Sequence, residues 1–432
     1  MKQKKTSNYF LLAFTIAAFT FVFQPLTSSG QSENNFFYKK KERTLGVIFN
    51  TNTEYEELLT DETRKLEELR LGNLNLQLKN CFWTFVDYKQ EQLNIAFDLG
   101  PIYGNGSWID SSKTYYEQAD HSLTGLRAKG EIDYSNLFYY SSKSFTLMQV
   151  KARGYFDLFR QHSIGTTRDS NRIITDLDEK FNATKFRYGF AVRAGWGTGR
   201  LQPMNHAMVT DYLLEKNYKG RTFSDKEKQL ITRKIEKIKN HRSLATGHDI
   251  VKEADDIAGF LNQSMFLLRP ENLASEWQYA EFLPRFHGSK VEIGPFFNHF
   301  NREPDFVYGG YLRYISEKYH NFKRNSSINA EIKYNRYKTN DWLSAEVALG
   351  WSYYFMLKSQ FYFGFKYVPI MPLKNFKGLS DINHGVVPNI SYFTQISNKT
   401  RFSFDFAWQI SEDKAIMQRG PEIMFTFFRS WY

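Results

Sequence analysis

Charged residues recur at every second position in several stretches of this chain. Arg127, Lys129, Glu131 and Asp133 form the clearest run, because an apolar or small residue separates each charge from the next. Side chains two residues apart in a β-strand share one face, so such a run predicts a strand with one ionic face. The candidate residues of these inner faces are Arg127, Lys129, Glu131, Asp133, Lys151, Arg153, Arg187, Arg193, Glu331, Lys333, Glu346, Lys366, Arg401 and Asp405.

Two roles are open to these charges. They could line a hydrophilic passage, or they could pair with one another across neighbouring strands and fill an interior that does not conduct. Both roles require the ionic faces to look into one enclosed space.

Residues that could do catalysis or bind metal are scattered. None of the nine histidines has a spacing that forces a triad or a metal site. The single cysteine, Cys81, excludes an intrachain disulfide and lies in a strand-like run as a small apolar residue. The run Gly195, Gly197, Gly199 and Arg200 lacks the Lys-Ser/Thr pair of a phosphate loop and suits a tight exit from a strand. We therefore expect no catalytic residue, no metal and no cofactor.

The residues between the charges show what positions them. Leu126, Ile132 and Tyr134 lie on the face opposite Arg127 to Asp133, and Phe402, Phe404, Phe406 and Trp408 lie opposite Arg401 to Gln409. Four large aromatic side chains on one face are costly in water and favourable in lipid. A membrane β-barrel places such faces outward and the charges in a wet interior.

Composition agrees with this interpretation. Aromatic residues make up 17% of the chain, with 40 Phe and 27 Tyr. The mean hydropathy is nevertheless −0.53. After the N-terminal region, no window approaches the roughly 18 uninterrupted apolar residues that a membrane-spanning helix needs.

Counting the alternating runs predicts about fourteen strands, within a range of about twelve to sixteen, and an even number is usual for bacterial barrels. Such barrels have short periplasmic turns and long extracellular loops. We expect tight turns near 87–91, 141–144, 323–326, 358–360 and 398–400, and long polar loops at 52–67, 101–122, 160–182, 374–384 and 411–420. The expected division is 31–200 for the first half of the barrel and 264–432 for the second.

Between the halves, residues 201–263 change to helical periodicity. Three helices are expected, with apolar stripes through Met208, Ile231 and Ile257, and a capping box of Ser224 and Glu227 opens the second. By strand parity this helical insert is periplasmic. The second helix is rich in Lys and Arg, which indicates a solvated face or a docking surface for an acidic periplasmic partner or anionic lipid.

The N-terminus resembles an export signal. Lys2, Lys4 and Lys5 precede an apolar run from Tyr9 to Phe23, and small residues follow through Gly30. Cleavage of residues 1–30 would lower the formal net charge from +11 by three, to +8. Export argues against nucleic acid as a partner.

The last strand carries Phe425, Phe427 and Phe428 and is followed by Trp431 and the terminal Tyr432. This ending resembles the C-terminal signature of bacterial outer-membrane β-barrels as a class. The resemblance implies an outer-membrane location, contact with outer-membrane lipid, and Phe428, Trp431 and Tyr432 as the signal read by the barrel-insertion machinery.

Three functions fit these expectations. The favoured one is a passive or gated channel for small hydrophilic solutes, with the helical insert as gate or plug. The second is a non-conducting barrel that anchors the insert as a docking module for an envelope assembly. An outer-membrane lipid-modifying enzyme is the least favoured, and we expect no enzymatic activity.

Overall fold

The protein is described by a computed structural model. It describes residues 37–59, 63–112, 115–169, 173–218, 220–240, 249–263, 273, 277, 285–301, 305–356, 358–374, 376, 378, 381–397, 399–411 and 420–430. All belong to the second of two contact units, Phe36–Tyr432. The expected export signal lies outside the described residues, as do Trp431 and Tyr432.

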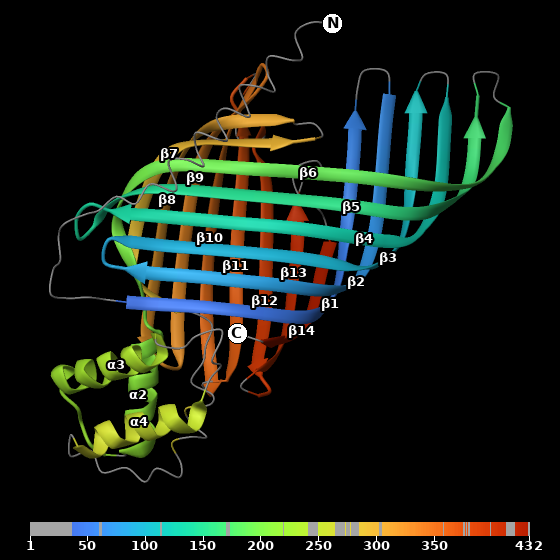
Figure 1. Cartoon of the computed structure of the whole chain (residues 1–432). Helices are drawn as coiled ribbons and strands as arrows, with labels where there is room; N and C mark the ends of the chain where they lie inside the picture. The colour runs from blue at the N-terminus through green and yellow to red at the C-terminus, as the bar shows by residue number, and fades with distance from the viewer. Residues whose placement is uncertain are drawn as a thin grey trace, which may run out of the picture. The chain divides into compact units, whose positions relative to one another are not determined.

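The described chain forms one closed antiparallel barrel of fourteen strands, which confirms the predicted fold class and strand number. Each strand pairs with its neighbours in the sequence, and β1 closes the sheet by pairing with β14 (Figure 1). The register of this closure places Gly46 opposite Phe428 and Phe49 opposite Phe425. A closed sheet leaves no unpaired edge, which lipid requires because it offers no hydrogen bonds to backbone groups.

Strand lengths divide the barrel into two parts. The first six strands, which we call the long strands, have 23 to 30 residues. They are β1 (Phe37–Leu59), β2 (Thr63–Val86), β3 (Lys89–Ser112), β4 (Tyr116–Tyr139), β5 (Ser144–Arg168) and β6 (Ile174–Pro203).

The other eight, the short strands, have 11 to 17 residues. They are β7 (Phe286–Phe300), β8 (Phe306–Asn321), β9 (Arg324–Tyr337), β10 (Asn340–Met356), β11 (Ser359–Pro372), β12 (Asn383–Gln395), β13 (Thr400–Ser411) and β14 (Gly420–Ser430). Because a tilted membrane strand needs about 9 to 11 residues, only the long strands extend far beyond a bilayer.

The predicted long loops at 52–67, 101–122 and 160–182 are wrong. The structure pairs the described residues of these ranges as continuations of the long strands, in three extended hairpins. Polar and apolar residues still alternate in these hairpins, but the polar side chains now face outward and the apolar ones inward. On β4, Ser122 and Thr124 face outward and Leu123 faces inward. The sequence interpretation took the loss of outward apolar residues for the end of the strand, whereas it marks only the end of the lipid-facing part.

The tight turns were predicted correctly. Each of the five expected ranges overlaps a short link between consecutive strands, for example the links between Val86 and Lys89 and between Asn321 and Arg324. The expected long link at 374–384 follows β11, which ends at Pro372, and precedes β12, which begins at Asn383. Most of the expected link at 411–420 lies outside the described residues.

Between β6 and β7 the described part of the chain contains the helices α2 (Asn205–Asn217), α3 (Asp225–Asn240) and α4 (Ile250–Gln263). Their apolar stripes bury Met208, Ile231 and Ile257 in one common cluster. The predicted capping box is confirmed, because the Ser224 backbone N–H donates to Glu227 Oε2 at 2.7 Å and the Glu227 N–H donates to Ser224 Oγ at 3.3 Å. No described helix combines the length and the apolar character needed to cross a membrane.

The glycine run lies within β6, which continues to Pro203 before the helices begin. Gly199 has a φ of +100°, a conformation that glycine adopts at little cost. A Cβ atom on Gly197 would lie 2.3 Å from the Phe145 ring. These glycines therefore allow close packing and a local backbone turn near the end of the strand.

Candidate functional site: a polar cavity inside the barrel

Alternation gives the barrel two different faces. On β3, the outward Phe97 is 51% exposed, while the next residue, the inward Asp98, is 5% exposed. Phe363 on β11 and Phe427 on β14 are likewise exposed on the outer face. An apolar outside and a polar inside are the reverse of a soluble fold and are those of a barrel in lipid.

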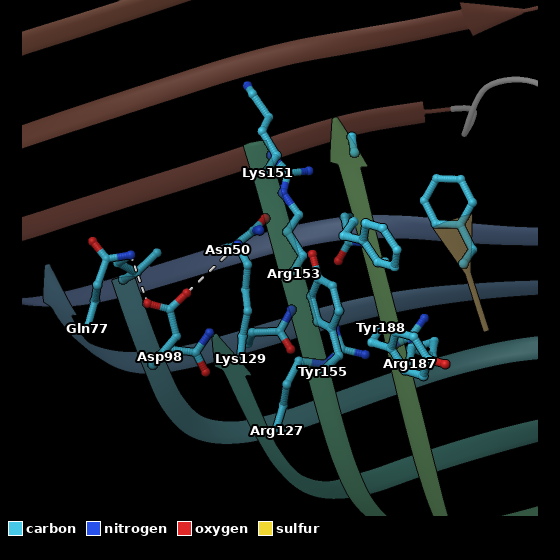
Figure 2. A pocket seen from close by; sticks show the side chains of 18 of the residues that line it. Asn50, Gln77, Asp98, Arg127, Lys129, Lys151, Arg153, Tyr155, Arg187 and Tyr188 are labelled. Carbon is cyan, nitrogen blue, oxygen red and sulfur yellow. Dashed lines mark hydrogen bonds and ion pairs between the residues drawn. The ribbon is translucent and has the colours of Figure 1, made fainter. Parts of the chain in front are cut away.

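Within the barrel lies a cavity of about 750 Å3. Its lining comes from β1 to β7 and β14, and Figure 2 shows Asn50, Gln77, Asp98 and several basic side chains around it. Five of the predicted residues line it: Arg127, Lys129, Lys151, Arg153 and Arg187. Among the described residues of this lining, only Asp98 and Glu422 carry negative charge.

The carboxylates that pair with these cations lie beside them in the barrel wall, on the same or the adjacent strand. Arg127 makes a bidentate ion pair with Asp157, with Nε–Oδ1 and Nη2–Oδ2 distances of 2.7 and 2.9 Å. Arg187 Nη2 approaches the same carboxylate at 2.8 Å. Bidentate guanidinium–carboxylate pairs are among the strongest side-chain hydrogen bonds, so this group fixes β4, β5 and β6 together.

The remaining predicted residues of β4 and β5 also pair between adjacent strands. Lys151 Nζ lies 3.0 Å from Asp133 Oδ2, and Arg153 Nη2 lies 3.0 Å from Glu131 Oε1. Glu131 also binds Lys129 at 3.2 Å. Lys151 and Arg153 are the most exposed cations of the cavity, with side chains 41% and 52% exposed.

A second ionic group lies on the short strands and on Arg193 of β6. Glu331 Oε1, whose side chain is 6% exposed, lies 3.1 Å from both Arg193 Nη1 and Lys333 Nζ. Arg313 joins Glu331 to Glu292, and Lys366 pairs with Glu346 at 2.9 Å. In this group the side chains of Arg193, Arg313 and Lys333 surround carboxylates that are more deeply buried than the cations.

Arg401 lies where the barrel closes. Its Nη1 binds Glu42 Oε1 at 2.6 Å, and Ser430 Oγ donates to the same oxygen at 2.7 Å. These contacts connect β13, β1 and β14, the strands that complete the ring. Asp405 occupies an inward register position opposite Met424 and lines no described cavity. Phe428 lies inward on β14, with its ring 5.7 Å from the Arg401 guanidinium.

Sequence reasoning missed several residues of the interior. Asp157, Glu42, Glu292 and Arg313 share the inward phase of the predicted cations, and that phase alone could have found them. It also missed the asparagines Asn50, Asn52, Asn73 and Asn75, which line the cavity from β1 and β2. Their signal is the alternation of Asn73, Asn75 and Gln77 with Leu74, Leu76 and Leu78.

Several contacts join the described helices to the barrel, among them the ion pair of Glu215 on α2 with Lys323 at 3.8 Å. The Tyr319 hydroxyl on β8 donates to Asp211 Oδ2 of α2 at 3.1 Å, and the Lys39 backbone N–H on β1 donates to Asn240 Oδ1 of α3 at 3.1 Å. Arg285, which precedes β7, donates to the Phe322 carbonyl at 2.7 Å. Burial lowers the pKa of Arg285 to about 10, which leaves it charged at neutral pH.

The described residues contain no group of three or more His, Cys, Asp or Glu side chains arranged to hold a metal ion.

No protein-family model and no curated protein matches the chain. Solved structures do. The β domain of the Bordetella autotransporter BrkA matches with 7% identity and a TM-score of 0.32, covering 90% of this chain and all of that one. The translocator domain of NalP from Neisseria meningitidis matches with 6% identity and a TM-score of 0.29, covering 99% and 97% of the two chains. Pseudomonas putida OprB matches with 8% identity and a TM-score of 0.29, covering 91% and 92%.

Identities this low concern the fold alone. The closed ring of fourteen antiparallel strands, with an apolar outer face and an ionic inner face, is the architecture of a β-barrel that spans a lipid bilayer. This chain is a transmembrane β-barrel of fourteen strands.

Proposed function

We propose that the barrel is a channel for small hydrophilic solutes and that the helices α2 to α4 gate it. One observation carries this proposal: the ion pairs around the cavity join adjacent strands and so run along the wall. Glu131 and Arg153 are direct register partners on β4 and β5, as are Asp133 and Lys151. Pairs of this kind satisfy the charges and still leave the polar cavity open to water and solute.

The gating part of the proposal rests on how the helices are held. They have their own apolar cluster, which also packs against Tyr319 and Phe322 of the barrel. Their polar contacts with the barrel among the described residues include the Asp211–Tyr319 and Asn240–Lys39 hydrogen bonds and the Glu215–Lys323 ion pair. A hydrogen bond of this type contributes about 0.5–1.5 kcal/mol, so thermal motion could separate the helices from the barrel without unfolding either.

Planar bilayer recordings test the channel. The full chain should conduct, and deleting residues 204–262 with a short linker in their place should raise the conductance or the open fraction. A double variant, Tyr319→Phe with Asn240→Ala, should raise the open fraction less, because the apolar contacts remain. Silence from the full chain and from the deletion would contradict the channel.

A second candidate function, a docking module, is favoured by the surface of α3. Lys226, Arg233 and Lys237 are exposed at helical spacing on one face. Such a face suits an acidic periplasmic partner or anionic lipid. Silent bilayers, together with binding of the full chain to anionic but not neutral vesicles or to an acidic peptide, would favour this function.

A further inference from the structure

The cavity combines two chemistries that neither a simple water-filled pore nor a filled interior requires. One part of its wall presents the basic side chains of β4, β5 and β6. Another part, on β1 and β2, presents asparagine amides. Figure 2 shows Asn50 together with Lys129, Lys151 and Arg153 around the same space.

The asparagines form a ladder across two strands. Asn50 is the direct register partner of Asn73. Asn52 and Asn75 each lie two residues later in the sequence of their own strand, and because β1 and β2 are antiparallel they lie on opposite sides of this pair. All four Oδ1 atoms are buried, and none accepts a hydrogen bond from the residues that the structure describes. An amide side chain offers two donors and an acceptor, which is the combination that sugar hydroxyls require.

The basic part has a different character. The side chains of Lys151 and Arg153 are among the more exposed of the interior charges, and their counterions Glu131 and Asp133 are not part of the cavity lining. Lys151 and Arg153 therefore present their ammonium and guanidinium groups to a solute in the cavity. Cations arranged in this way attract anions and can bind carboxylate or phosphate oxygens directly.

We propose that this cavity is a binding site for a polyhydroxylated anion, a sugar acid or a sugar phosphate, with Lys151 and Arg153 binding the anionic group and the asparagine ladder binding the hydroxyls. The volume of about 750 Å3 lies within the range of about 300–1,000 Å3 usual for small-molecule sites. The proposal names the solute class of the proposed channel and in that sense rests on it, although binding itself needs no conduction.

Titration calorimetry on the full chain in detergent, at low ionic strength, tests the site. The probes are glucuronate, glucose 6-phosphate, glucose and inorganic phosphate. At least one of the charged sugars should bind about tenfold or more tightly than both glucose and inorganic phosphate, and the ranking of glucuronate against glucose 6-phosphate identifies the anionic group. Equal affinity for glucose and the charged sugars, phosphate as tight as glucose 6-phosphate, or no binding of any probe would each overturn the proposal.

Variants assign the two parts of the site. Arg153→Gln leaves Glu131 paired with Lys129, so folding should be preserved, and the affinity for charged sugars should fall about tenfold. The double variant Asn50→Ala with Asn73→Ala should weaken the charged sugars and leave the weak binding of inorganic phosphate unchanged. Lys366→Gln removes one cation of the short strands outside the cavity lining and is the matched control. Equal losses in Arg153→Gln and Lys366→Gln would overturn the assignment.

The two proposals can fail separately. Binding of charged sugars by a protein that is silent in bilayers would retain the site and remove the channel. A protein that conducts but binds the four probes with equal affinity would retain the channel and remove the binding site.

Discussion

The long strands and the short strands belong to one closed ring, yet they differ in what their inner faces carry. The short strands nearly match the membrane, and on their inner face Arg313 and Lys333 lie against the buried carboxylate of Glu331. On the long strand β5, inward residues change from Lys151 and Arg153 to the buried Asp157 and then to Phe159. The inward-facing residues of β5 thus line the polar cavity along one part of the strand and join an apolar cluster further along.

This difference shows that inside and outside are set by lipid and not by the strand itself. Beyond the bilayer the outer face meets water, so it becomes polar, and the inner face of the extended hairpins can bury apolar side chains as a soluble sheet does. Leu69, Leu71, Ile102, Leu123 and Phe159 form that cluster. The reversal of polarity therefore locates the membrane boundary on the long strands.

The largest expected effect concerns Asp157 in the long strands. Asp157→Asn leaves Arg127 and Arg187 facing a neutral amide in a site where the carboxylate was 3% exposed. Removing one partner of a buried ion pair costs about 3–5 kcal/mol of stability. The free energy of unfolding, from urea titration in lipid vesicles, measures this loss.

Glu346→Gln on the short strands is the comparison. Its pair with Lys366 is well solvated, with side chains 28% and 39% exposed, and such pairs contribute about 0–1 kcal/mol. Equal losses in the two variants would remove the contrast between buried and solvated pairs.

The apolar cluster of the extended hairpins gives the next effect. Ile102 is 2% exposed, and Ile102→Ala should cost about 2–5 kcal/mol, because it leaves a cavity among packed side chains. The loss should appear as faster amide hydrogen exchange in residues 100–126, with exchange in β9 to β12 unchanged. Ser122→Ala, on the outer face of the same hairpin, should change exchange little. Uniform acceleration over the whole barrel would show that the hairpins are not a separate unit of stability.

A lysine introduced at either of two positions on β4 tests where the membrane boundary lies. Ile132 and Ser122 both face outward. Ile132→Lys should cost about 2–4 kcal/mol if it lies near the middle of the bilayer, because a cation there leaves water. Ser122→Lys should cost almost nothing. Unfolding in lipid vesicles measures both, and similar costs would place Ser122 within the membrane.

Much of the barrel follows from alternation alone. Phe402, Phe404 and Phe406 against Arg401, Ser403 and Asp405 specify a strand and its lipid face without further information. Tight turns follow too, because two to five residues separate such runs. Helical periodicity predicts the three helices, and the Ser224–Glu227 pair marks the start of one of them.

The extended hairpins do not follow in the same way, because the alternation reverses its polarity where lipid ends, and a strand recognised by its outward apolar residues ends at that reversal. The phase was continuous from Asp133 to Leu123 on β4, but a search for outward apolar residues stops at Leu126. The ion pairs inside the barrel do not follow from the sequence pattern either. Asp157 accepts from two arginines on different strands, and that requires the register of β4, β5 and β6.

The smallest effect concerns the helices, which link the long and short strands. Ser224→Ala removes the hydroxyl that caps α3 and should cost that helix about 1 kcal/mol.

The Ser224 backbone N–H and hydroxyl hold the pKa of Glu227 below its usual value. A carboxyl with a lowered pKa in the folded state stabilises above its unfolded pKa and loses that contribution as pH falls through the folded value. Hydrogen exchange in residues 225–240 should therefore accelerate in acid for the unmodified chain, and Glu227→Gln should remove part of this pH dependence. If exchange in β7 to β14 accelerated equally, the helices would be unfolding together with the barrel, and they could not open as a gate while the barrel stays intact.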